Sequence, residues 1–267
     1  MIEALSFEFM RNALLAGLLA SVACGVIGSL VVVNRVVFVA GGISHAAYGG
    51  VGLAFFMGLP VLPVTVAFSL AVAAVMAAVT FGRRERADTV VGVLWAAGMA
   101  FGIILVDLAH GYNVDLMSFL FGSILAVPSF DLWLMACLDA VLLAVVVFNY
   151  RGFAAMSFDA EFAGLRGVPV RFLYFTMLAM IAVSIVMIIR VVGLILVIAL
   201  MTIPPSLAER GCRSLGVMML RSGLYAAFFC LAGLCVSYVF DLTSGASIIA
   251  VASACFFAAR LWGGGEA

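Results

Sequence analysis

The sequence predicts an all-α, polytopic integral membrane protein with about nine transmembrane helices and one short re-entrant or interfacial helix. Its composition supports this fold class, because 67% of the 267 residues are hydrophobic and only 10% are charged. The mean hydropathy of +1.34 agrees. The apolar residues are gathered into successive runs of roughly 20 residues, the helix length that crosses about 30 Å of hydrocarbon. A soluble core could not bury this much apolar surface, so we expect the chain to lie in a membrane.

The expected spans follow one another with short polar or turn-forming connections. They cover residues 10–33, 42–58, 61–81, 89–109, 130–149, 171–189, 191–208, 217–239 and 245–262. The apolar piece 116–127 is too short to cross the bilayer and is expected to be re-entrant or interfacial. Arg190 interrupts residues 171–208, which form either two spans or one broken helix with the arginine buried in protein. The whole chain, 1–267, is expected to form a single transmembrane domain.

The arginines predict how the spans are oriented. Cytoplasmic loops are enriched in Arg and Lys, and all 13 basic residues of this chain are arginine. Alternating spans place every arginine except Arg11 and Arg190 on one side of the membrane. We therefore expect a multi-pass protein of the inner (plasma) membrane, with its N-terminus outside and its C-terminus in the cytoplasm.

The stretch Ala40–Met57 is apolar enough for a bilayer, yet it is crowded with small residues and carries His45. Gly42, Ala46 and Gly50 recur every fourth residue, so on a helix they form one stripe that lets neighbouring helices approach closely. A titratable side chain in such a helix is costly and commonly functional. His45 is therefore either a packing histidine that hydrogen-bonds a neighbouring helix or a ligand on a transport path.

The longest connection expected in the cytoplasm is Tyr150–Arg171. Asp159 can cap a short amphipathic helix there, with Phe158, Phe162 and Leu165 as its outward apolar residues. Such a helix either lies on the lipid headgroups or docks into a cytoplasmic partner. The residues by themselves leave both interpretations open.

The composition also excludes several kinds of activity. The chain has no lysine, so it carries neither a phosphate-binding P-loop nor a Schiff-base lysine. It has no His-Glu-x-x-His motif either, so we expect no enzyme, and any ATP hydrolysis would belong to a separate ATPase subunit. The six cysteines lie mostly in apolar runs without a Cys-x-x-Cys pair, which is typical of packing residues. A net charge of zero gives no indication of nucleic-acid binding.

Several short segments form an ordered pattern along nearly the whole chain. They are Ile43–Ala46 with the glycines that follow, Ala87–Thr89 before Gly92, Val114–Met117, Phe119–Gly122, Asp159–Ala163, Val192–Leu194, Ile203–Pro205, and Asp241 with Ser244–Gly245. Each segment is a weak signal alone, but the ordered set is specific. It resembles the permease subunits of bacterial ABC importers for zinc, manganese and iron.

This resemblance implies the membrane-spanning subunit of an ATP-driven importer, which carries a divalent transition metal ion and holds no cofactor permanently. It implies a permease dimer, cytoplasmic ATPase subunits and an extracytoplasmic metal-binding protein as partners. His45 matches a histidine near the metal path of such permeases. The segment 150–171 is similar to the coupling segment that contacts the ATPase, and its matching residues are Asp159, Glu161, Phe162, Gly164 and Gly167.

Three positions depart from the pattern of that family. Gly41 and Ser123 stand where relatives often carry an acidic residue, and no proline follows Asp241. The resemblance therefore predicts neither which metal is carried nor whether the two permease copies are identical.

Two acidic residues are further candidates for the metal path. Asp241 lies in the last outer turn and could be a ligand, although an aspartate at a helix entry is more commonly an N-cap. Asp139 lies mid-span, where a charge costs roughly 2.5–3.5 kcal/mol, so it must face protein or water or stay protonated. A dimer contact, an internal hydrogen bond and a pathway acid all stay open for Asp139. Together with His45 it also allows the alternative of a self-contained secondary cation or metal transporter.

Overall fold

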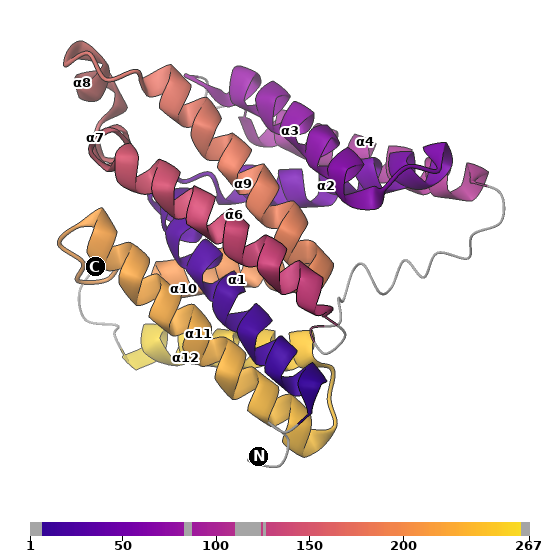
Figure 1. Ribbon diagram of the computed structural model, residues 1–267. Coiled ribbons are helices and arrows are strands. Elements are labelled where there is room, and N and C mark those ends of the chain that lie inside the picture. Colours follow the sequence, from indigo (N-terminus) through magenta and orange to yellow (C-terminus); the bar gives the residue numbers. More distant parts are fainter. Residues whose placement is uncertain (1–6, 83–86, 110–123, 125–126, 263–267) are drawn as a thin grey trace. The chain divides into compact units, whose positions relative to one another are not determined.

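The computed structural model describes residues 7–82, 87–109, 124 and 127–262. Within these ranges the chain forms helices and no strand, which confirms the all-α fold class (Figure 1). The helices are α1 (Glu8–Val33), α2 (Val37–Met57), α3 (Val61–Thr80), α4 (Ala87–Leu108), α6 (Ser129–Phe148), α7 (Tyr150–Phe158), α8 (Ala160–Leu165), α9 (Val170–Val192), α10 (Leu194–Ala208), α11 (Leu215–Phe240) and α12 (Ser244–Trp262).

Most of these helices are long and apolar enough to cross a membrane. In the described part of the chain there are 8 of them, namely α1, α2, α3, α4, α6, α9, α11 and α12. The apolar helix α10 has 15 residues, so it extends only about 22 Å and is shorter than a bilayer core. The expected short helix at 116–127 lies outside the described residues, except for positions 124 and 127. The matching segments between 114 and 122 also lie outside them.

Residues 171–208 form two helices, α9 and α10, which are joined at Gly193. Its dihedral angles, φ +83° and ψ 163°, belong to a region that essentially only glycine adopts. Arg190 in the last turn of α9 pairs through Nε with the Asp131 carboxylate of α6 at 3.2 Å. The Arg190 side chain is 42% exposed, so the alternative of an arginine buried in protein is wrong. The buried partner of this ion pair is Asp131.

The described chain divides into two compact units, and each is described here by itself. The first, called the α2 unit, contains α2, α3, α4, α7, α8 and most of α9. The second, called the α11 unit, contains α1, most of α6, the last residues of α9, and α10, α11 and α12.

In the α2 unit, α2 packs against both α3 and α4 (Figure 1). Small residues allow this close approach. A Cβ atom placed on Gly50 of α2 would lie 2.8 Å from the Thr65 Cα of α3. One placed on Gly98 of α4 would lie 2.8 Å from the Ala46 Cα of α2. Gly42 faces α4 in the same way, so the predicted small-residue stripe is confirmed as the packing face of α2.

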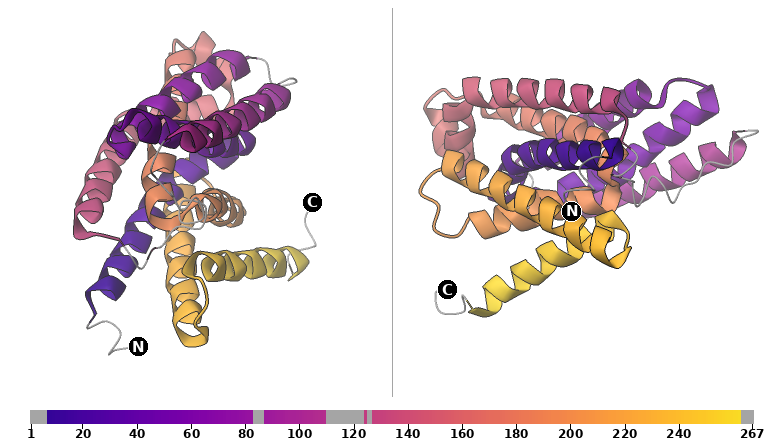
Figure 2. Two further views of the ribbon diagram at one scale, coloured as in Figure 1. Left: turned by 90° about the vertical axis from the view of Figure 1, so that its right-hand side faces the viewer. Right: turned by 60° about the horizontal axis from the view of Figure 1, so that its bottom comes forward.

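The α11 unit uses glycines in the same manner. Gly25 of α1 lies against the backbone of Gly223 in α11, and a Cβ atom on Gly25 would come within 2.6 Å of it. The helices α11 and α12 also pack against each other and against α10. Both views of Figure 2 show α11 and α12 diverging from the short turn that joins them. Gly233 of α11 lies directly against the Ile248 backbone of α12.

Candidate functional site

His45 lies on α2 beside the packing stripe, because it directly precedes Ala46 in the sequence. The side chain is partly buried, and its Nδ1 atom is buried without a hydrogen-bond partner among the described residues. A packing histidine needs such a partner, since an unsatisfied buried polar atom costs about 1–3 kcal/mol. An unpartnered ring nitrogen is, in contrast, what a metal-binding imidazole presents before the metal arrives.

An aromatic residue of α4 covers this histidine. The Trp95 and His45 rings are stacked, with their centroids 4.1 Å apart and their planes 15° from parallel. The Trp95 indole N–H donates to the Met99 sulfur at 3.2 Å. The Phe38 ring also lies near Trp95, with the two ring centroids 6.0 Å apart. Trp95 has no local signal in the sequence that marks it as a neighbour of His45, because the two residues lie far apart along the chain.

The described residues do not form a complete metal cage around His45. Among the described residues, no group of three or more His, Cys, Asp or Glu side chains could hold a metal ion. One turn before His45, a Cβ atom placed on Gly41 would meet no atom within 4 Å. Within the described residues His45 therefore belongs to no such group, and the open space lies one turn before it, beside Gly41.

The two acidic candidates lie in the α11 unit, whereas His45 lies in the α2 unit. Asp139 is 7% exposed, and its Oδ2 atom has no hydrogen-bond partner among the described residues. The Cys24 thiol of α1 lies within electrostatic range of this carboxyl group. Asp139 therefore faces the interior of the α11 unit, and its role as a pathway acid stays a prediction.

Asp241 has a different position from the one expected for a capping aspartate. It is exposed and is the C-cap residue of α11, with a left-handed φ of +54°. The alternative of an N-cap is therefore wrong. The turn is held by the Ser237 hydroxyl, which donates to the Leu242 carbonyl at 2.6 Å. A role for Asp241 as a metal ligand stays a prediction.

The segment 150–171 forms α7, α8 and the start of α9. The Asp159 carboxylate accepts the Phe162 backbone N–H at 2.9 Å, which confirms Asp159 as the N-cap of α8. The helix ends at Leu165, just before Gly167, whose φ is +81°. Only glycine adopts this conformation at little cost, so Gly167 suits the turn that follows the helix end.

The short helix α8 presents an apolar face outward. Phe162 is 55% exposed and Leu165 is 88% exposed, whereas Ala163 on the opposite side is buried. Glu161 and Gly164 are exposed as well. Phe162 and Leu165 therefore agree with the sequence prediction, whereas Phe158 is exposed but is the last residue of α7 and does not belong to this helix. The two exposed side chains give α8 a surface that lipid or a partner protein can cover.

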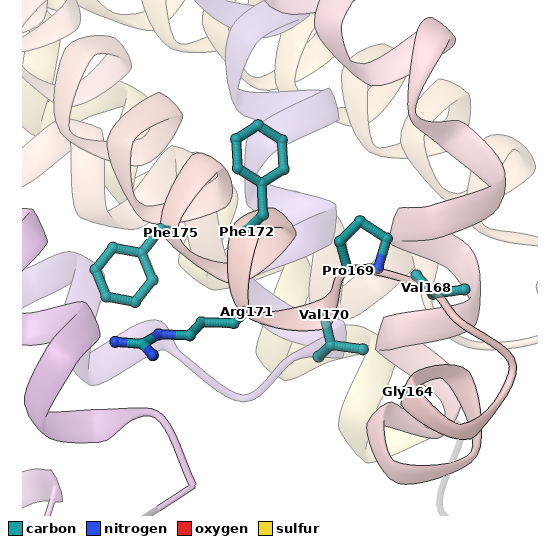
Figure 3. A pocket seen from close by; sticks show the side chains of 7 residues that line it. All are labelled: Gly164, Val168, Pro169, Val170, Arg171, Phe172 and Phe175. Atoms are coloured by element: carbon teal, nitrogen blue, oxygen red, sulfur yellow. The ribbon is translucent and has the colours of Figure 1, made fainter.

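A surface hollow of about 730 Å³ lies beside α8. Figure 3 shows the residues that line it: Gly164 of α8, Val168 and Pro169 of the connection, and Val170, Arg171, Phe172 and Phe175 of α9. The Arg171 guanidinium lies over the Phe175 ring, 5.8 Å from its centroid. The hollow is thus mainly apolar, with one cation at its edge.

Comparison with known proteins identifies the family. A model of the ABC 3 transport family matches residues 6–263. The chain belongs to the ABC 3 transport family. This membership confirms the resemblance found in the ordered sequence segments, and a permease that crosses the membrane several times agrees with the helices described above.

Individual relatives cover almost the whole chain. The manganese transport system membrane protein MntC of Listeria monocytogenes is 31% identical over 97% of this chain and 92% of its own length. A membrane protein of Synechocystis, slr2045, which is described as uncharacterized, is 48% identical over 95% of this chain and 90% of its own. Among solved structures, PsaBC of Streptococcus pneumoniae in complex with Fab matches with a TM-score of 0.86 and 29% identity, covering 97% of this chain and 94% of that one.

Proposed function

We propose that this chain is the membrane-spanning permease subunit of an ATP-driven ABC importer for a divalent transition metal: zinc, manganese or iron. The observation that carries the proposal is the match to the ABC 3 transport family over residues 6–263. The name of the Listeria relative, a manganese transport system membrane protein, supports a metal ion as the substrate. On this proposal the metal is cargo, and the permease holds no permanent cofactor.

His45 is the proposed metal-binding group on the path. Neutral imidazole binds zinc, manganese and iron through a ring nitrogen, and the buried Nδ1 atom of His45 lacks any other partner among the described residues. A transport site must also release its ion, so one histidine completed by water suits it better than a closed four-ligand cage. The absence of a three-ligand cluster in the described part of the chain supports such a transient site.

The coupling surface is proposed to be α8. A chain without lysine has no P-loop of its own, so a cytoplasmic ATPase subunit must supply the hydrolysis of ATP. The capped helix α8 offers this subunit the exposed side chains of Phe162 and Leu165, beside the apolar hollow at the start of α9. Burial of these two side chains in a protein interface would stabilise the complex by roughly 1.5–3 kcal/mol for each side chain.

The remaining proposals concern orientation and assembly. The arginine distribution supports an N-terminus outside and a C-terminus in the cytoplasm of the plasma membrane. An external metal-binding protein would then deliver the ion from outside, and two permease copies would together form the path. The latter proposal accounts for the absence of a three-ligand group around His45 among the described residues, because a second copy can approach the same ion.

Metal uptake by proteoliposomes that contain the permease and its ATPase tests the proposed path. His45→Ala should reduce uptake of radioactive manganese or zinc strongly, while expression, assembly with the ATPase and thermal stability stay close to the wild type. His45→Gln is the matched control, because it keeps much of the volume and the hydrogen-bonding capacity but binds metal poorly. Full uptake by His45→Gln would show that the residue serves packing.

The same vesicles separate an importer from a self-contained secondary transporter. An importer subunit requires the ATPase and ATP, so vesicles with the permease alone should take up no metal. Uptake by the permease alone, driven by a proton gradient, would contradict the proposal and favour the secondary transporter.

A further inference from the structure

The contact between Trp95 and His45 gives the proposed metal site a defined geometry. The two rings lie 4.1 Å apart and 15° from parallel, so the indole covers one face of the imidazole. A histidine binds a metal through a nitrogen lone pair that lies in the plane of its ring. Stacking on the face therefore occupies neither ring nitrogen, while it restricts rotation of the ring.

Trp95 is itself held in place by its surroundings. Its indole N–H donates to the Met99 sulfur at 3.2 Å, and the Phe38 ring lies nearby with a centroid distance of 6.0 Å. Three residues further along α4, Gly98 lies directly against Ala46, the residue after His45. The backbone carrying Trp95 is thus fixed relative to the backbone carrying His45, and a stack between two such side chains has little freedom to slip.

We propose that Trp95 is the positioning residue of this site, which orients the His45 ring and preferentially stabilises it when a metal ion is bound. The proposal rests on the proposed function of His45. A bound divalent metal withdraws electron density from the imidazole and leaves it partly cationic. An indole face attracts a cation more strongly than any other aromatic side chain does. The stack is therefore stronger in the metal-loaded state than in the empty state.

Substitution of Trp95 measures this effect. Trp95→Leu should weaken the binding of Mn²⁺ and Zn²⁺ by about 2- to 30-fold, the range that corresponds to one cation–π contact. Trp95→Phe keeps a ring on the imidazole and should lose less. The matched control is Phe101→Leu on the same helix, where Phe101 stacks on Phe68 with a centroid distance of 6.2 Å. This variant removes an aromatic pair between α3 and α4, and it leaves His45 and Trp95 untouched.

Equilibrium dialysis of the full chain in lipid nanodiscs, with radioactive Mn²⁺ and Zn²⁺, gives the affinities of the wild type, these three variants and His45→Ala. A second readout uses the wild-type contact itself. In the Trp133→Phe, Trp262→Phe background, Trp95 is the single tryptophan, and Co²⁺ bound at His45 should quench its fluorescence. A chelator should restore the signal, and His45→Ala should abolish the quenching.

The outcomes separate this inference from the proposed function. Wild-type affinity in Trp95→Leu, together with loss of binding in His45→Ala, would overturn the role of Trp95 and leave that of His45 intact. Unchanged binding in His45→Ala would instead overturn the proposed metal site. If Trp95→Leu lowers stability, Trp95→Phe decides, because it keeps a ring on the imidazole: an affinity clearly above that of Trp95→Leu supports the role of Trp95, and an affinity no better than that of Trp95→Leu contradicts it.

Discussion

Substitution of Gly98 tests how closely α2 and α4 must pack for the site at His45 to form. A Cβ atom on Gly98 would lie 2.8 Å from the Ala46 Cα and 2.9 Å from the Ala46 Cβ. Carbon atoms ordinarily keep about 3.5–4.0 Å between them. The first of these contacts is with backbone, which cannot rotate away as a side chain can. In Gly98→Ala the two helices must therefore separate locally or bear the overlap.

The cost can be estimated with a matched variant on the same helix. Overpacking of this kind costs about 1–3 kcal/mol, whereas Ala favours a helix over Gly by about 1 kcal/mol. Gly92→Ala gains the helix preference of Ala without the overpacking, because a Cβ atom at Gly92 would meet nothing within 4 Å. The helix preference cancels between the two variants, so Gly98→Ala should be less stable than Gly92→Ala by about 1–3 kcal/mol.

Thermal denaturation of both variants in one detergent, followed by fluorescence-detected size-exclusion chromatography, measures this difference. At roughly 2–4 °C per kcal/mol for a chain of this size, Gly98→Ala should lose its monodisperse peak about 2–12 °C below Gly92→Ala. Equal midpoints would show that α2 and α4 do not depend on a glycine at this position. The reasoning from small-residue contacts would then fail.

Three further predictions follow from the other contacts. Phe162→Asp should place a charge on the exposed face of α8 and abolish copurification of the ATPase without preventing membrane insertion; unchanged copurification would mean that α8 lies on lipid. Arg190→Ala should lower stability by about 1–3 kcal/mol because the buried Asp131 carboxylate loses its partner, and adding Asp131→Asn should recover part of the loss, as thermal denaturation can show. Single cysteines at Gly58 and Gly167 should react with a membrane-impermeant maleimide only from the outside and only from the inside, respectively; the reverse pattern would contradict the orientation.

Hydropathy predicted most of the fold because a bilayer leaves the backbone few choices. Each N–H and C=O group in lipid must be hydrogen-bonded within the helix, so the length of an apolar run and the length of the helix nearly coincide. The helix α2 departs from this rule at its start, since it begins at Val37 rather than at 42. Arg35, with φ +57°, lies in the short turn between α1 and α2, and hydropathy carries no signal for such a turn.

The parts of the site that could be predicted are those with local signals. Asp159 caps α8 because its side chain reaches a backbone N–H three residues later, and this spacing is visible in the sequence. The stack of Trp95 on His45 and the pair of Arg190 with Asp131 join residues on different helices. A single sequence does not show where two helices cross, so these contacts could be seen only in the structure.

Two neighbouring residues of α2 have different roles: Ala46 packs against α4, and His45 is the proposed metal-binding residue. This arrangement links helix packing to transport. Successive side chains on a helix point about 100° apart, so Ala46 can face Gly98 of α4 while His45 lies at the edge of that contact. Close approach at Gly98 also fixes the position of Trp95, one turn earlier on α4, relative to α2, and so brings the Trp95 ring over the imidazole. A change that separates α2 from α4 should therefore reduce stability and metal affinity together. Gly98→Ala should weaken Mn²⁺ binding even though it touches neither ring, whereas Gly92→Ala should leave it unchanged. Equal affinities in the two variants would show that the stack forms independently of the small-residue contact.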